Sequence, residues 1–131
     1  MSPFLITLIL LAQAPSADRI LGTWNTPNGE SKIEIVKCAE AYCGSIKSLA
    51  KVGAKDGHNA DASLRGRPLL GLQILKGFRH QEPDTWTDGT LYAPERGRDV
   101  SPKLVLTGPD TLEVRVSVGI VKKTVAWTRV K

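Results

Sequence analysis

The chain has 131 residues, of which 41% are hydrophobic and 24% charged, which indicates one globular domain and excludes wholesale disorder. Its 18 Lys and Arg exceed its 13 Asp and Glu, giving a net charge of +5. The basic residues are spread along the chain with few aromatic residues among them, which argues against nucleic-acid binding.

Residues 1–17 carry no charged side chain, and the segment from Phe4 to Ala12 is almost wholly apolar. This segment is too short to span a bilayer, which takes about 20 residues, but it matches the apolar region of a secretory signal peptide. We therefore predict a signal peptide over residues 1–17, a single domain over residues 18–131, no transmembrane span and a periplasmic or secreted location. A buried N-terminal strand is the alternative.

The two cysteines, Cys38 and Cys43, flank a four-residue segment, 39–42, after the alternating apolar and polar stretch 31–37. In an oxidising compartment such a pair indicates a disulfide rather than metal or redox chemistry. Opposed hairpin positions have Cα atoms about 5.5 Å apart, within bridging range. We predict a disulfide that pins a hairpin.

Alternation with a period of two continues to the C-terminus and predicts strands. The expected strands cover residues 22–26, 31–37, 70–78, 85–92, 103–107, 112–118 and 122–130, with one more after Cys43. The polar segment 53–68 holds at most one short helical turn, around residues 62–65. The sequence therefore predicts an all-β fold, a single antiparallel barrel of about eight strands. The predicted inward residues are Ile33, Ile35, Leu72, Ile74, Leu104, Leu106, Val114 and Val116.

Two short motifs favour a closed barrel. Gly22-Thr23-Trp24 opens the first predicted strand and Trp127-Thr128-Arg129 closes the last, which resembles the signature of the calycin superfamily of lipocalins, fatty-acid-binding proteins and avidins. The resemblance implies that Trp24 packs against Arg129 and closes one end of the barrel by a cation–π contact. The alternative is that Trp24 is simply a core or rim aromatic residue.

A closer resemblance extends over nearly all of residues 18–131. Its motifs are Gly22-Thr23-Trp24, Cys43-Gly44, Asn59-Ala60-Asp61, Leu64-Arg65-Gly66-Arg67-Pro68-Leu69-Leu70-Gly71, Trp86, Gly89-Thr90-Leu91-Tyr92-Ala93-Pro94-Glu95-Arg96-Gly97 and Trp127-Thr128-Arg129-Val130. Together they resemble the bacterial domain-of-unknown-function family 2147. The resemblance implies an exported small β-barrel and transfers no catalytic residue.

The polar segment 55–61, followed by Arg65 and Arg67, is the best candidate for a site. Its oxygen-bearing side chains could wrap a calcium ion, could accept backbone N–H bonds and pair with the arginines to hold the loop, or could leave the arginines to grip an anionic head group. The EF-hand template is not matched, and no metal or cofactor is predicted. The candidate ligand-binding residues are Asn59, Asp61, Arg65, Arg67, Trp86 and Tyr92.

Nucleophilic catalysis has little support, because His58 and His80 are the only histidines and no G-x-S-x-G motif frames a serine. We predict a protein that is not an enzyme and that binds a small, partly apolar or amphipathic ligand. The alternative is an interaction module with a filled core, an inhibitor or accessory of an envelope enzyme that binds through loops 53–68 and 93–102. The basic charge suits an anionic envelope component as partner. Nothing in the sequence defines an oligomeric state.

Overall fold

The structure is a computed structural model that describes residues 16–131. Most of the predicted signal peptide, residues 1–15, lies outside the described residues. Over the described residues, the fold is a ten-stranded antiparallel sheet with three short 3-10 helices, η1 (Ser16–Ile20), η2 (Pro27–Gly29) and η3 (Ala62–Leu64). The strands are β1 (Gly22–Asn25), β2 (Ser31–Cys38), β3 (Ala41–Leu49), β4 (Gln73–Gln81), β5 (Thr85–Thr87), β6 (Thr90–Ala93), β7 (Arg98–Val100), β8 (Lys103–Gly108), β9 (Thr111–Val118) and β10 (Val121–Arg129).

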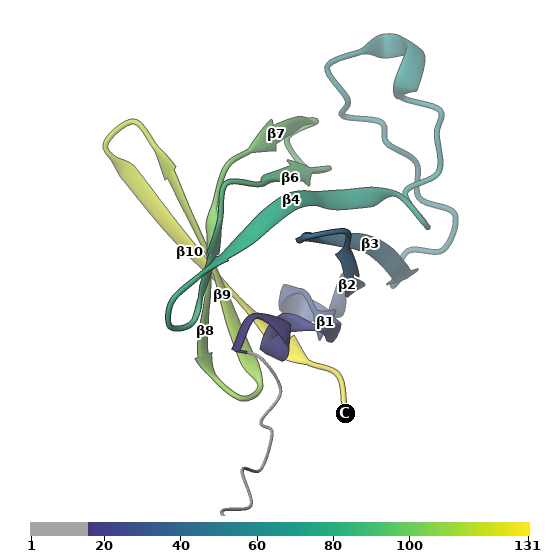
Figure 1. Ribbon diagram of the computed structural model, residues 1–131. Helices are drawn as coiled ribbons and strands as arrows, with labels where there is room; N and C mark the ends of the chain where they lie inside the picture. The colour runs from purple at the N-terminus through teal and green to yellow at the C-terminus, as the bar shows by residue number, and fades with distance from the viewer. Residues whose placement is uncertain (1–15) are drawn as a thin grey trace, which may run out of the picture.

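The sheet closes into a barrel because β3 pairs with β4 as well as with β2 (Figure 1). β5 and β6 both pair with β4 and are two halves of one strand, interrupted where Asp88 takes a φ of 67°. β7 pairs with β6 and β8 pairs with β5, so β7 and β8 form a second interrupted strand. The interruption lies at Pro102, which has no N–H to donate. Counted this way the barrel has eight strands, and the predicted fold class is confirmed.

The strand boundaries differ from the prediction at a few places. β4 begins at Gln73 rather than Leu70, because Gly71 with a φ of 82° turns the chain just before it. The expected helical turn is η3, capped by the side chain of Asp61, which accepts a hydrogen bond from the Ser63 backbone N–H. β7, η1 and η2 were not predicted. Within the described residues, no helix is long and apolar enough to span a membrane.

The alternating pattern places the predicted residues inside the barrel. Six of the eight predicted inward residues are buried, while Leu72 and Val116 are partly buried and pack against the same core. The largest fully buried side chains are Trp24, Trp86 and Phe78. The indole N–H groups of the two tryptophans donate to carbonyls of η1, which marks the end of the barrel that η1 covers. We call this end, where η1 lies over the barrel, the closed end.

The closed end is built from η1 and its hydrogen bonds to the barrel. Trp24 Nε1 donates to the Ile20 carbonyl over 3.0 Å and Trp86 Nε1 donates to the Ala17 carbonyl over 3.2 Å. Tyr42 donates its hydroxyl proton to the Asp18 carboxylate over 2.5 Å. Burial, together with this hydrogen bond, raises the pKa of Tyr42 to about 12.

Arg129 contacts both Trp24, the partner that the motif resemblance implied, and η1, which was not predicted. Its guanidinium lies over the Trp24 ring, 4.3 Å from the centroid. It also donates to the backbone carbonyls of Leu21, Arg19 and Pro109 over 2.7, 2.8 and 3.0 Å. Gly22 makes room for it, since a Cβ on Gly22 would lie 2.8 Å from a guanidinium nitrogen.

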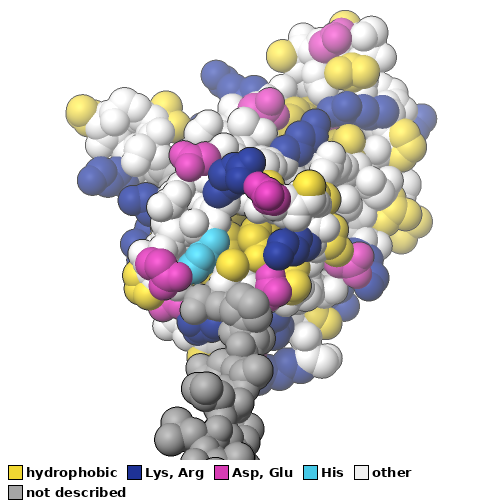
Figure 2. Space-filling view, in the orientation of Figure 1, with side chains coloured by type: hydrophobic (Ala, Val, Ile, Leu, Met, Phe, Trp, Pro, Cys, Tyr) yellow, Lys and Arg dark blue, Asp and Glu magenta, His cyan; other side chains and the backbone are white. Residues whose placement is uncertain are grey.

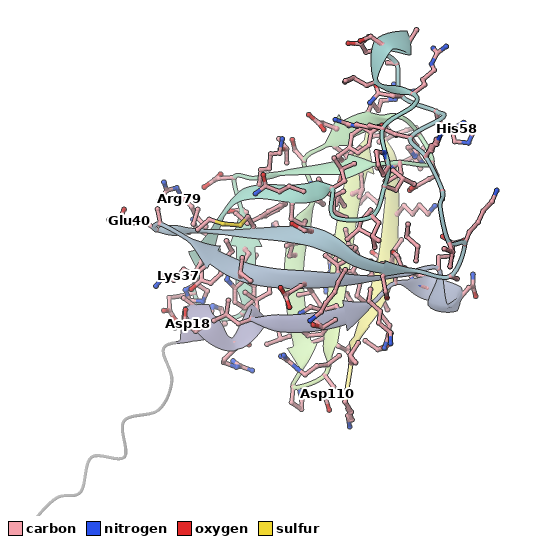
Figure 3. All side chains as sticks on the ribbon, turned by 90° about the vertical axis from the view of Figure 1, so that its right-hand side faces the viewer. Asp18, Lys37, Glu40, His58, Arg79 and Asp110 are labelled. Atoms are coloured by element: carbon pink, nitrogen blue, oxygen red, sulfur yellow. A yellow bond between two sulfur atoms is a disulfide. The ribbon has the colours of Figure 1, made fainter. Side chains whose placement is uncertain are left out.

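The predicted disulfide between Cys38 and Cys43 is present, with Cα atoms 5.9 Å apart (Figure 3). The expected geometry was wrong in one respect, since the two cysteines are not opposed. Cys38 pairs with Ala41 and Cys43 with Val36, so the bond runs diagonally. The turn has two residues rather than four, because Ala39 adopts a φ of 56°, which a tight hairpin turn needs.

Candidate functional site

A cavity of about 750 Å³ occupies the half of the barrel away from η1. Its lining includes residues of the β1–β2 connection, of loop 50–72 between β3 and β4, and of the β6–β7 and β9–β10 hairpins. These connections surround the opening of the barrel, which we call the mouth. The barrel is therefore filled at one end and hollow at the other.

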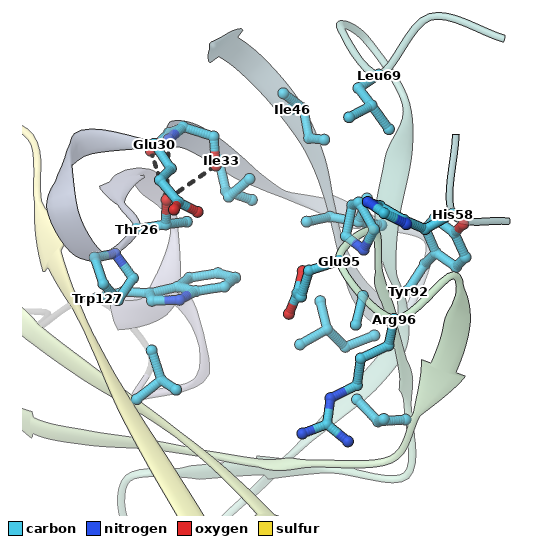
Figure 4. A pocket seen from close by; sticks show the side chains of 18 of the residues that line it. Thr26, Glu30, Ile33, Ile46, His58, Leu69, Tyr92, Glu95, Arg96 and Trp127 are labelled. Carbon is cyan, nitrogen blue, oxygen red and sulfur yellow. Dashed lines mark hydrogen bonds between the residues drawn. The ribbon is translucent and has the colours of Figure 1, made fainter. Parts of the chain in front are cut away.

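The floor of the cavity is apolar because the inward positions of the strands point into it. Ile33, Ile46, Ile74, Leu91 and Trp127 contribute to the floor, and Figure 4 shows Trp127 facing the space opposite Tyr92 and Glu95. Aromatic side chains fill the closed end, whereas the inward positions near the mouth carry smaller β-branched residues. These smaller residues are Val100, Val116 and Val125. Their size leaves space that neighbouring side chains do not fill.

Charged side chains line the rim of the cavity. Four are basic and two are acidic: Lys51, Lys55, Arg96, Lys123, Glu30 and Glu95. His58 and Tyr92 add polar groups on the side of loop 50–72. An apolar floor below a rim with an excess of cations suits a molecule with an apolar body and an anionic or polar head.

A buried hydrogen-bond network around Asp56 holds loop 50–72 against β6. Asp56 accepts hydrogen bonds from Tyr92 Oη over 2.6 Å, Asn59 Nδ2 over 2.8 Å and Arg67 Nε over 2.9 Å. Burial alone would raise the pKa of Asp56, but these donors and the charge of Arg67 outweigh it, and the pKa of Asp56 is lowered. Burial and the bond to Asp56 raise the pKa of Tyr92. The network therefore contains a carboxylate and a neutral phenol.

Loop 50–72 also rests directly on the β6–β7 turn. Gly97 has a φ of 68°, and a Cβ at this position would lie 1.7 Å from the His58 carbonyl oxygen. The Ala60 N–H donates to the Gly97 carbonyl over 3.1 Å. Only glycine fits this contact, which fixes the loop beside the mouth.

Among the candidate ligand-binding residues, Tyr92 lines the cavity and the other five do not. Asn59 and Arg67 bind Asp56 behind Tyr92, and the Arg67 guanidinium lies 5.3 Å from the Tyr92 ring centroid. Arg65 donates to the Asn59 carbonyl.

Two candidates lie elsewhere. Asp61 caps η3, and Trp86 is buried at the closed end, where it packs against His80. The polar segment thus holds the loop together, which is the second of the three predicted interpretations. Among the described residues, no group of three His, Cys, Asp or Glu could hold a metal ion.

The rim cations and Trp127 were not predicted to line a cavity. Trp127 occupies an inward position of an alternating strand, and that signal could have identified it. The rim residues lie in separate connections, and no local pattern relates Lys51 to Arg96 or Lys123.

Comparisons with known proteins agree with this architecture. Residues 22–129 match a family described as "Uncharacterized protein conserved in bacteria (DUF2147)". No curated protein matches the chain. Among solved structures, protein HP1028 from the human pathogen Helicobacter pylori, described as belonging to the lipocalin family, matches with a TM-score of 0.74 and 20% identity over 85% of this chain and 82% of its own. The match shows a shared fold, and the predicted calycin-like barrel is confirmed.

Proposed function

Since the chain belongs to the bacterial domain-of-unknown-function family 2147, whose description names no activity, we propose its function from its cavity: it is an exported protein that binds a small ligand with an apolar body and an anionic head. The observation that carries the proposal is the cavity of about 750 Å³ at the mouth. Ligand sites in proteins commonly have volumes of about 300–1,000 Å³ and an apolar lining with a few polar groups.

The position of each group supports this orientation of the ligand. The apolar body would lie on Trp127, Ile33 and Ile74, and the head would lie at the rim near Lys51 and Arg96, where cations outnumber carboxylates. Tyr92 would contact the ligand, and its hydroxyl is held by Asp56. Asn59 and Arg67 position Tyr92 rather than touch the ligand.

Binding without a chemical reaction is the proposal that these contacts favour. His58 lines the mouth, whereas His80 packs on Trp86 at the closed end, so the two histidines do not share a site. The alternative of an interaction module with a filled core is less well supported, since the hollow half of the barrel is what ligand binding requires.

Export is supported by the composition of residues 1–17 and by the Cys38–Cys43 disulfide, since disulfides persist in oxidising compartments. A mature chain that begins near Asp18 would lose the Ala17 carbonyl to which Trp86 donates. It would keep the Asp18–Tyr42 hydrogen bond and the Arg19–Asp84 ion pair that fasten the rest of η1. Intact mass spectrometry of the protein recovered from producing cells would identify its N-terminus.

Native mass spectrometry with added hexadecanoate tests the proposal. We expect a one-to-one complex, and we expect hexadecanol, which has the same chain length without the charge, to bind more weakly. Val125→Phe, which fills part of the cavity with a larger side chain, should weaken binding at least about tenfold, because the ligand would be packed against the added ring.

The matched control is Val105→Phe, since Val105 lies on β8 between the buried residues Leu104 and Leu106 and points outward. This variant should bind as the parent does. Absence of any complex with hexadecanoate, or equal binding by both variants, would contradict a ligand site in the cavity.

A further inference from the structure

The β9–β10 hairpin extends beyond the barrel and presents apolar side chains without a covering strand. Val118 and Val121 pair across the hairpin, and Ile120 at its turn is 100% exposed. Residues 121–124 of β10 are all exposed, so both faces of the hairpin are open to solvent here. Figure 1 shows this hairpin projecting from the barrel (yellow-green, upper left).

Loop 50–72 forms a second projection at the same mouth. It carries three exposed large apolar residues, Val52, Leu64 and Leu70, of which Val52 is 92% exposed. Residues of both projections line the same cavity, and both rise on the same side of the molecule in Figure 1. Of the exposed large apolar residues in the described part of the chain, all but Val36 lie on these two projections.

Basic residues are adjacent in sequence to the exposed apolar residues of both projections. Lys122 and Lys123 follow Val121, Lys51 precedes Val52, and Arg65 follows Leu64. Figure 2 shows hydrophobic side chains at both tips with Lys and Arg side chains near them.

The two ends of the molecule differ in charge. The connections around the mouth, residues 26–30, 50–72, 94–99 and 117–123, hold eight Lys and Arg against five Asp and Glu. One of those acids, Asp56, is buried and paired with Arg67. The closed end has balanced charge, with five Lys and Arg and five Asp and Glu in residues 18–19, 37–40, 79–84, 109–110 and 129–131. Its charged residues include Asp18, Arg19, Lys37, Arg79 and Asp110.

We propose that the mouth docks on an anionic lipid bilayer, with the tip of the β9–β10 hairpin inserted among the head groups and the rim cations against the lipid charges. Apolar tips flanked by Lys and Arg bind such interfaces by burying the apolar groups at the head-group level while the cations meet anionic lipids. In this orientation the cavity opens onto the lipid surface. A second copy of the chain fits the mouth less well, because the two rims carry the same net charge.

Vesicle co-sedimentation tests the proposal, using protein recovered from cells producing the full chain. We expect binding to vesicles of phosphatidylglycerol and phosphatidylcholine, little binding to phosphatidylcholine alone, and weaker binding at high ionic strength. Ile120→Asp and Lys122→Glu should each reduce the bound fraction at least about threefold, because they remove the inserted side chain and one contact cation. Neither residue lines the cavity.

The matched controls place the same changes away from the mouth. Val36→Asp alters the exposed apolar residue of β2, and Arg79→Glu alters an exposed cation of β4 near the closed end (Figure 3). Both should bind anionic vesicles as the parent does. The proposal would be overturned if the protein did not bind anionic vesicles, or if Ile120→Asp left the binding intact. It would also be overturned if the protein formed a dimer that Ile120→Asp abolishes and did not bind vesicles.

The docking proposal and the ligand proposal fail separately. Ile120→Asp should still bind hexadecanoate in native mass spectrometry, because the cavity floor is unchanged. A protein that binds vesicles through Ile120 but takes up no hexadecanoate would contradict the proposed ligand while leaving the docking surface intact.

Discussion

Asp56 is a buried residue that holds loop 50–72 in position against β6. Its side chain is buried and accepts hydrogen bonds from Asn59, Arg67 and Tyr92. A buried carboxylate is costly unless donors surround it, and here they lower its pKa below the ordinary value of 3.8. The charged form of Asp56 therefore stabilises the folded protein.

This shift predicts how stability depends on pH. A carboxyl with a lowered pKa contributes stability that is present above its unfolded pKa of 3.8 and is lost as the pH falls through its folded pKa. Asp56→Asn should lower the free energy of unfolding by roughly 2–4 kcal/mol at neutral pH, and the gap from the parent should narrow below a pH of about 4. Urea unfolding across this pH range measures the gap. A gap that stays constant down to a pH of about 2.5 would contradict the role of the charge.

Predictability at this scale depended on whether a local spacing or a known motif links the residues. The disulfide followed from a spacing of five residues, and the expected contact between Trp24 and Arg129 came from a motif resemblance despite their distance along the chain. Asp56 and Tyr92 are 36 residues apart, and no sequence pattern joins them, so the sequence left three interpretations of the segment open.

Among the elements, loop 50–72 and the β6–β7 turn meet at a contact that admits no side chain. Gly97→Ala would place a methyl group against the His58 carbonyl and force a φ of 68° on alanine. We expect the free energy of unfolding to fall by about 2 kcal/mol or more, and loop 50–72 to be cleaved faster by trypsin, because it would detach from the turn.

Two other glycines separate the causes. Gly53→Ala carries a comparable φ of 79° with no atom near the added carbon, and Gly108→Ala has an open environment and an ordinary φ. For Gly53→Ala, the free energy of unfolding should fall only by the cost of backbone strain. For Gly108→Ala, it should hardly change. Equal losses for Gly97→Ala and Gly53→Ala would contradict the contact with His58.

Strands with regular alternation were predicted within a few residues, as β2, β9 and β10 show. β7 has three residues and no apolar alternation, so its pairing with β6 is set by the barrel rather than by its own sequence. η1 was not predicted because no local sequence pattern defines it. Its conformation is held by side chains outside it, since Trp24, Trp86 and Arg129 donate hydrogen bonds to its carbonyls.

At the scale of the whole molecule, the barrel divides into a filled and a hollow half. Trp24, Phe78 and Trp86 fill the closed end, whereas valines face the cavity near the mouth. The number of strands could be predicted from alternation and turns. The cavity could not, because it depends on which inward residues face one another across the barrel.

The distribution of tryptophans allows the central claim, a ligand in the cavity, to be tested directly. Trp127 faces the cavity, while Trp24 and Trp86 are buried at the closed end. A fatty acid brominated along its chain quenches only tryptophans that it approaches closely. We expect it to quench part of the fluorescence of the parent protein and almost none of that of Trp127→Phe. A parent protein that brominated fatty acid does not quench, or quenching that survives in Trp127→Phe, would contradict a ligand in the cavity.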